Sequence, residues 1–161
     1  MNAYGARPRV GLAAAMLFGL CAVYQFTLGL YFVQFRPPLL PEDLRFLGVT
    51  AGTLGSGLPE LARWLDLVFI VMGGQMAAVG ALTGVFVFRL ARGKECGGLE
   101  LGLLALAGAM STGLMGWVNF VLGSDFRWLL VVPILAWASG TAMAAYAART
   151  PLVPGRPAKA P

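Results

Sequence analysis

Charged side chains that could bind a ligand or take part in chemistry lie at the edges of long apolar stretches of this chain. Five of them fall near one set of edges, and we name them the candidate outer rim: Glu60, Arg63, Asp66, Asp125 and Arg127. Acids and arginines held together could bind a charged headgroup or form a catalytic mouth, whereas as solvated interfacial charges they would do neither. No charged residue lies inside the apolar stretches, which argues against a proton relay, an ion pump or a voltage sensor.

Other reactive side chains are scarce. The chain has no histidine, the commonest ligand of haem, zinc and copper and the commonest general base, so we predict no metal site, no cofactor and no catalytic residue. Cys21 lies in an apolar stretch and Cys96 in a connection, and no disulfide is expected between them. The net charge is +5, but the twelve Lys and Arg residues form no basic stripe, so no nucleic-acid partner is predicted.

Three amide side chains inside apolar stretches form a candidate polar cluster: Gln25, Gln75 and Asn119. Gln25 and Gln75 each lie about 13 Å along a helix from the same side of the membrane, and Asn119 lies about 9 Å from it. Because polar groups are costly in lipid, we expect these amides to hydrogen-bond one another. They would then hold helices together or line a small polar cavity.

Small residues recur at helical spacing on the second apolar stretch: Gly73, Ala77, Gly80 and Gly84. On a helix they fall on the side away from Gln75. If Gln75 points into a bundle, this glycine stripe points outward and would form a helix-packing or partner interface, because small residues let backbones approach closely. The alternative is that these glycines simply face lipid.

Four uncharged stretches must position all of these residues: 10–33, 67–88, 101–124 and 128–148. Each is longer than the roughly 20 residues that a helix needs to cross a hydrocarbon core. The overall composition is 58% hydrophobic and 12% charged, about half the charge of a soluble domain. We predict an all-α fold, a single four-helix transmembrane bundle over residues 1–149 in up-down-up-down order, with a disordered cytoplasmic tail at 150–161.

The distribution of cationic residues predicts the orientation. Eight of the twelve fall on the side of the amino terminus, namely Arg7, Arg9, Arg89, Arg92, Lys94, Arg149, Arg156 and Lys159. The opposite side holds Arg36, Arg45, Arg63 and Arg127. Since Lys and Arg concentrate in cytoplasmic loops, both termini are expected to be cytoplasmic. The first stretch is too long for the core of a cleaved signal peptide, so it is expected to be retained as a helix.

The long outer segment between the first two stretches, residues 34–66, has its own pattern. Pro37 and Pro38 end the first helix, and Pro41, Glu42 and Asp43 begin a short one, because proline and acids suit the first turn. Four glycines then break the segment: Gly48, Gly52, Gly55 and Gly57. We interpret the segment as a lid on the outer mouth of the bundle, or else as an amphipathic connector among the headgroups.

One part of the chain, residues 40–80, carries a loose motif. It consists of Leu40-Pro41-Glu42-Asp43, Phe46-Leu47-Gly48-Val49-Thr50, Pro59-Glu60-Leu61, and Asp66 leading to Gly74-Gln75-Met76-Ala77-Ala78-Val79-Gly80. This motif resembles a pattern in small uncharacterised bacterial four-helix integral membrane proteins. The resemblance implies a bacterial inner-membrane location and no particular activity.

These patterns favour a protein without chemistry of its own. We expect an accessory or scaffold subunit or a small homo-oligomer, with the lipid bilayer and a membrane-protein partner or second copy as its surroundings. A carrier of lipid or of a small apolar ligand, using an outer-leaflet cavity, is the first alternative. A membrane-embedded enzyme is the second.

Overall fold

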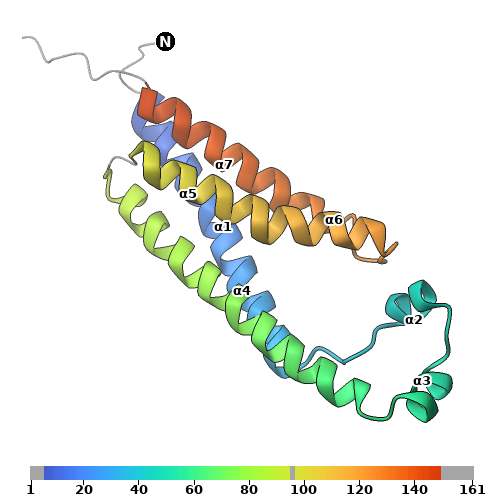
Figure 1. Cartoon of the computed structure of the whole chain (residues 1–161). Helices are drawn as coiled ribbons and strands as arrows, with labels where there is room; N and C mark the ends of the chain where they lie inside the picture. The colour runs from blue at the N-terminus through green and yellow to red at the C-terminus, as the bar shows by residue number, and fades with distance from the viewer. Residues whose placement is uncertain (1–5, 95–96, 150–161) are drawn as a thin grey trace, which may run out of the picture.

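The structure is a computed structural model that describes residues 6–94 and 97–149. Over these ranges it is entirely helical (Figure 1), as predicted. The elements in chain order are α1 (Ala6–Gln34), α2 (Pro41–Leu47), α3 (Ala51–Gly57), α4 (Leu61–Ala91), α5 (Gly98–Gly108), the π-helix η2 (Ala109–Gly113), α6 (Leu114–Val121) and α7 (Val131–Arg149). The tail at 150–161 and Cys96 lie outside the described residues.

Four helices are long and apolar enough to cross a membrane, which confirms the predicted class. They cover Val10–Gln34, Leu61–Ala91, Gly98–Val121 and Val131–Arg149. Each contains or nearly matches a predicted stretch. The third is α5, η2 and α6 in continuous succession, and its π turn was not predicted. The alternating directions in Figure 1 fit an up-down-up-down order.

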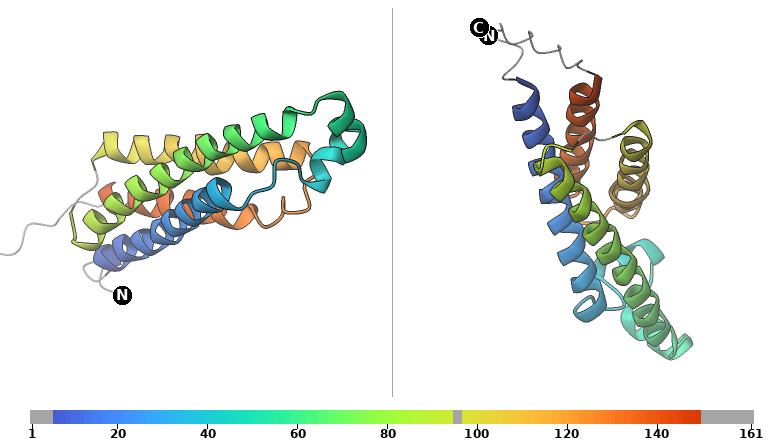
Figure 2. Two further views of the ribbon diagram at one scale, coloured as in Figure 1. Left: turned by 90° about the horizontal axis from the view of Figure 1, so that it is seen from below. Right: turned by 90° about the vertical axis from the view of Figure 1, so that its left-hand side faces the viewer.

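Helix α1 lies between two others, packing along α4 on one side and α7 on the other (Figures 1 and 2). Helix α5 packs against α7, and at its first turn it is joined to α4 by an ion pair of 2.6 Å between Arg89 Nη1 and Glu100 Oε1. Glu100 also accepts a hydrogen bond of 3.0 Å from the backbone N–H of Gly97, which caps α5. The start of α1 and the end of α7 lie at this same end of the bundle.

The core lies where α1, α5 and α7 meet. Phe18 is fully buried and meets Trp137 edge to face, with ring centroids 5.8 Å apart. The indole N–H of Trp137 donates a hydrogen bond of 2.9 Å to the carbonyl of Leu104, so its polar atom is satisfied in an apolar setting. Gly108 lies directly beneath the same indole, where no side chain would fit.

The outer segment contains two short helices. Helix α2 begins at Pro41 as predicted, with Asp43 Oδ2 accepting a 2.9 Å hydrogen bond from the N–H of Leu40. Gly48 ends it with φ of 67°, a conformation that favours glycine. The prediction that the later glycines break the chain was wrong, because α3 forms over them. Thr50 caps it by accepting a hydrogen bond of 3.2 Å from the N–H of Thr53.

Candidate functional site

Gln25 is the most completely enclosed polar side chain among the described residues. It is 0% exposed on α1, and its Nε2 donates a hydrogen bond of 3.0 Å to Oγ1 of Thr112 in η2. Its Oε1 is also buried and has no partner within the described part of the chain. The contact links α1 to the third membrane helix at the π turn. Thr112 was not predicted as a site residue, since threonine is common in apolar helices.

The predicted cluster of Gln25, Gln75 and Asn119 does not form in the structure. Gln75 lies on the exposed face of α4 and makes no hydrogen bond to any described residue. Asn119 turns back on its own helix, with Nδ2 donating a hydrogen bond of 2.9 Å to the carbonyl of Met115. The cluster was predicted from depth alone, and depth does not determine the direction in which a side chain points.

The glycine stripe of α4 explains this outcome, because it faces inward. A Cβ at Gly80 would come 2.5 Å from the backbone N of Phe26, and one at Gly73 would come 2.6 Å from the carbonyl O of Gly29. Ala77 completes this contact with α1, while nothing lies within 4 Å of a Cβ at Gly84. The stripe is therefore a helix-packing surface inside the chain. The expectation that the stripe points outward toward a partner was wrong. The expectation that Gln75 points into the bundle was wrong for the same reason.

The candidate outer rim divides into separate local contacts. Arg63 and Glu60 are 4.0 Å apart and both more than four-fifths exposed. Asp66 is exposed. Across the described residues, no ion pair joins these three to the other two rim residues. Asp125 instead pairs with Arg45, and Arg127 Nη1 donates to the carbonyls of Gly123 at 2.9 Å and Ser124 at 3.1 Å.

A buried contact at the same end was missed by the sequence analysis. Glu42 of α2 is only 4% exposed, and its Oε1 accepts a hydrogen bond of 3.1 Å from Oγ of Ser124, which is 1% exposed. Beside it, Arg45 Nη2 donates to both carboxylate oxygens of Asp125 at 2.9 Å. We name these two pairs the outer latch. They attach α2 to the loop between α6 and α7. The paired residues are 82 and 80 positions apart in the sequence, so no local pattern could reveal these contacts.

Arg36 fixes the other end of this segment. Its guanidinium lies 3.4 Å from the ring centroid of Phe69 on α4 and 3.5 Å from Asp43 Oδ2. Burial lowers the pKa of Arg36, while the negative charge of Asp43 acts in the opposite direction. The contact therefore ties the exit of α1 to both α2 and α4 through one side chain.

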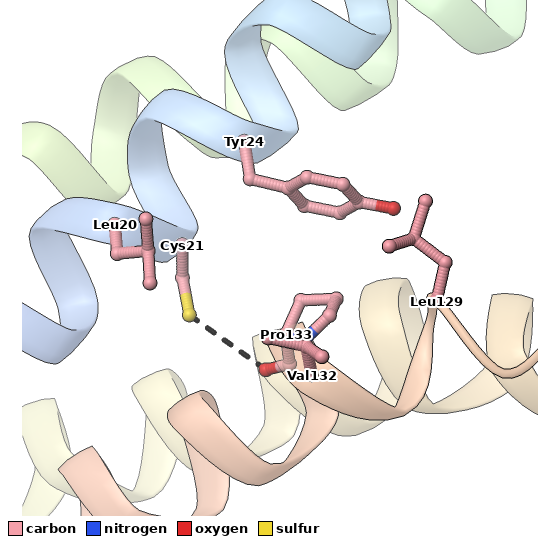
Figure 3. Close-up of a pocket in the computed structure, with 6 residues that line it drawn as sticks. All are labelled: Leu20, Cys21, Tyr24, Leu129, Val132 and Pro133. Carbon is pink, nitrogen blue, oxygen red and sulfur yellow. Dashed lines mark hydrogen bonds between the residues drawn. The ribbon is translucent and has the colours of Figure 1, made fainter.

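An apolar pocket of about 230 Å³ lies between α1 and the start of α7 (Figure 3). Its lining residues are Leu20, Cys21, Tyr24, Leu129, Val132 and Pro133. In Figure 3 the Tyr24 ring reaches across toward Leu129, and the Cys21 thiol donates a hydrogen bond of 3.7 Å to the carbonyl of Pro133. The surface that the pocket presents is apolar and carries no charged group, so it suits a hydrocarbon better than a polar ligand.

Together, the four apolar helices define the class: a multi-pass integral membrane protein. No group of three or more His, Cys, Asp or Glu side chains that could hold a metal ion occurs among residues 6–94 and 97–149. No protein-family model, curated protein or solved structure matches the chain.

Proposed function

We propose that this chain is a non-catalytic integral membrane protein that acts by associating with another membrane protein or with further copies of itself. The observation that carries this proposal is the outward position of Gln75 on α4. A polar side chain exposed near the middle of a membrane helix is costly in lipid unless a partner satisfies it. An accessory or scaffold subunit and a small homo-oligomer both supply such a partner.

The proposal includes a location and an orientation. We place the chain in a bacterial inner membrane with both termini in the cytoplasm. Among the described residues, the end shared by α1, α4 and α7 carries six cations, and the opposite end carries four. The six are Arg7, Arg9, Arg89, Arg92, Lys94 and Arg149, and the four are Arg36, Arg45, Arg63 and Arg127. The positive-inside rule supports this assignment.

A second candidate function is binding or transport of a lipid or small apolar ligand. The pocket beside Tyr24 favours it, because its apolar lining opens toward the surroundings at membrane depth. Its volume is below the range of roughly 300–1,000 Å³ typical of small-molecule sites, so it would take one hydrocarbon segment only.

Native mass spectrometry after purification in mild detergent tests these functions. Association predicts that a second protein, or a second copy, is retained in fixed stoichiometry. Ligand binding predicts a retained lipid that is lost in a Leu129→Trp variant, which fills the pocket. A Leu106→Trp control should keep the lipid, because Leu106 is exposed on α5 and does not line the pocket. A bare monomer without protein or lipid would contradict both.

A further inference from the structure

Building on the proposed association, we propose that the partner is a second copy of this chain, with α4 packed against α4 and the two Gln75 side chains hydrogen-bonded to each other. The inference starts from where Gln75 stands. It is nine residues beyond Asp66, or about 13 Å along the helix, so it lies near the middle of a hydrocarbon core about 30 Å thick. At that depth neither water nor a headgroup can reach it.

The chain itself cannot satisfy this amide. Turning α4 to bury Gln75 would move Gly73 and Gly80 away from α1, where their contacts with backbone atoms leave no room for a different residue. Gln25, at comparable depth, is 0% exposed and bonded to Thr112 of η2, so it is enclosed and cannot be reached from the exposed face of α4. The partner must therefore come from outside the chain.

A second copy fits this requirement by symmetry. Two copies in the same membrane share one orientation, so a twofold axis along the membrane normal places both Gln75 residues at one depth. A primary amide carries both donors and an acceptor, and two of them can donate to each other. A partner of different sequence would need a polar group of its own at this depth, whereas a second copy necessarily has one in Gln75.

The surface around Gln75 allows the close approach that such a pair needs. Gly74 and Ala78 are exposed four residues apart, and a Cβ at Gly74 would meet nothing within 4 Å. Small residues at this spacing let two helix backbones come near. Val71, Leu82 and Val85, which are 64%, 65% and 58% exposed, border them and would pack against the second copy.

The test measures the distribution between monomer and dimer of the full chain in detergent micelles and in liposomes. Gln75→Leu is expected to weaken dimerisation roughly tenfold, equivalent to about 1.4 kcal/mol, and Gln75→Asn should restore much of it. Thr27→Val is the matched control, since Thr27 is exposed on α1 but its hydroxyl already donates to the carbonyl of Val23. That control should dimerise like the wild type.

Cross-linking locates the interface independently of affinity. In a Cys96→Ser background, Ala78→Cys should form a disulfide-linked dimer on oxidation, whereas Val23→Cys, which is exposed on α1, should not. If Gln75→Leu lowers the melting temperature of the monomer, Ala78→Leu replaces it, because Ala78 is also exposed and its substitution blocks close approach.

The outcomes separate this inference from the proposed function. A monomeric chain that retains a different membrane protein, released by Gln75→Leu, would overturn the second copy and keep the accessory subunit. A dimer that is insensitive to Gln75→Leu and to Ala78→Leu would overturn the α4 interface and keep the association. A chain that stays alone in liposomes would overturn both.

Discussion

Two glutamines, each inside a long apolar stretch, lie in opposite environments in this protein. Gln25 is enclosed between α1 and η2, and Gln75 points away from the bundle. The difference arises from their neighbours. On α4 the smallest residues occupy the face that meets α1, so the larger amide is left on the other side. Close packing of the α4 and α1 backbones therefore determines which way Gln75 points. The amide faces away from the bundle although a polar group in a membrane would be better satisfied inside it.

The Gln25–Thr112 contact gives a residue-scale prediction. Thr112→Val should destabilise the bundle by about 1 kcal/mol, because it leaves the amide of Gln25 buried without a partner. Gln25→Met in the same chain should recover much of that loss, since it removes the polar group and keeps the volume. Thermal unfolding of both single variants and the double variant in detergent measures the coupling. Additive effects would show that the hydrogen bond contributes nothing.

At the scale of elements, the packing of α4 on α1 predicts different effects for two neighbouring glycines. Gly80→Ala should lower the free energy of unfolding by roughly 1–3 kcal/mol, because the new Cβ meets the backbone of Phe26. Gly84→Ala, one turn further on, meets nothing within 4 Å and should be neutral or stabilising, since alanine favours helix. Chemical unfolding in micelles compares them. Equal effects would mean that α4 does not pack on this face.

The outer latch leads to a prediction about α2. Ser124→Ala removes the hydrogen bond to the buried carboxylate of Glu42 and should speed hydrogen exchange of the α2 amides roughly tenfold, corresponding to a loss of about 1.4 kcal/mol. Arg45→Gln should have a smaller effect, because its pair with Asp125 is about three-fifths exposed. Exchange measured by mass spectrometry on α2 peptides, with α7 peptides as the internal reference, tests both. Unchanged exchange in Ser124→Ala would show that other contacts hold α2.

The elements themselves could be predicted from the sequence, while their faces could not. Length and the absence of charge determine the four long helices, and Pro41 with two acids determines the start of α2. The inward side of α4 depends on which helix it meets, and a single sequence does not contain that information. The Glu42–Ser124 contact joins residues far apart in the chain, and the π turn at Ala109–Gly113 has no local signature. The candidate polar cluster was wrong because it required Gln75 to point toward the other helices, a direction that the sequence does not specify, although the fold was correct.

At the scale of the whole molecule, the two ends of the bundle differ in charge and in architecture. One end gathers the start of α1, the end of α7 and the short connection from α4 to α5. The other end carries α2, α3 and the outer latch. The segment held by the outer latch therefore lies at one end of the bundle, and the greater number of cations lies at the other.

Site-directed labelling tests this asymmetry in intact cells. With Cys96 replaced by serine, a cysteine at Lys94 should react with a membrane-impermeant maleimide only after the cells are opened, because the proposed orientation places the cation-rich end in the cytoplasm. A cysteine at Gly55 in α3 should react in intact cells, since that position is exposed at the opposite end. Buried Cys21 should stay unlabelled in both and serves as the background. Labelling of position 94 from outside, with position 55 protected, would reverse the orientation and place α2, α3 and the outer latch on the cytoplasmic face.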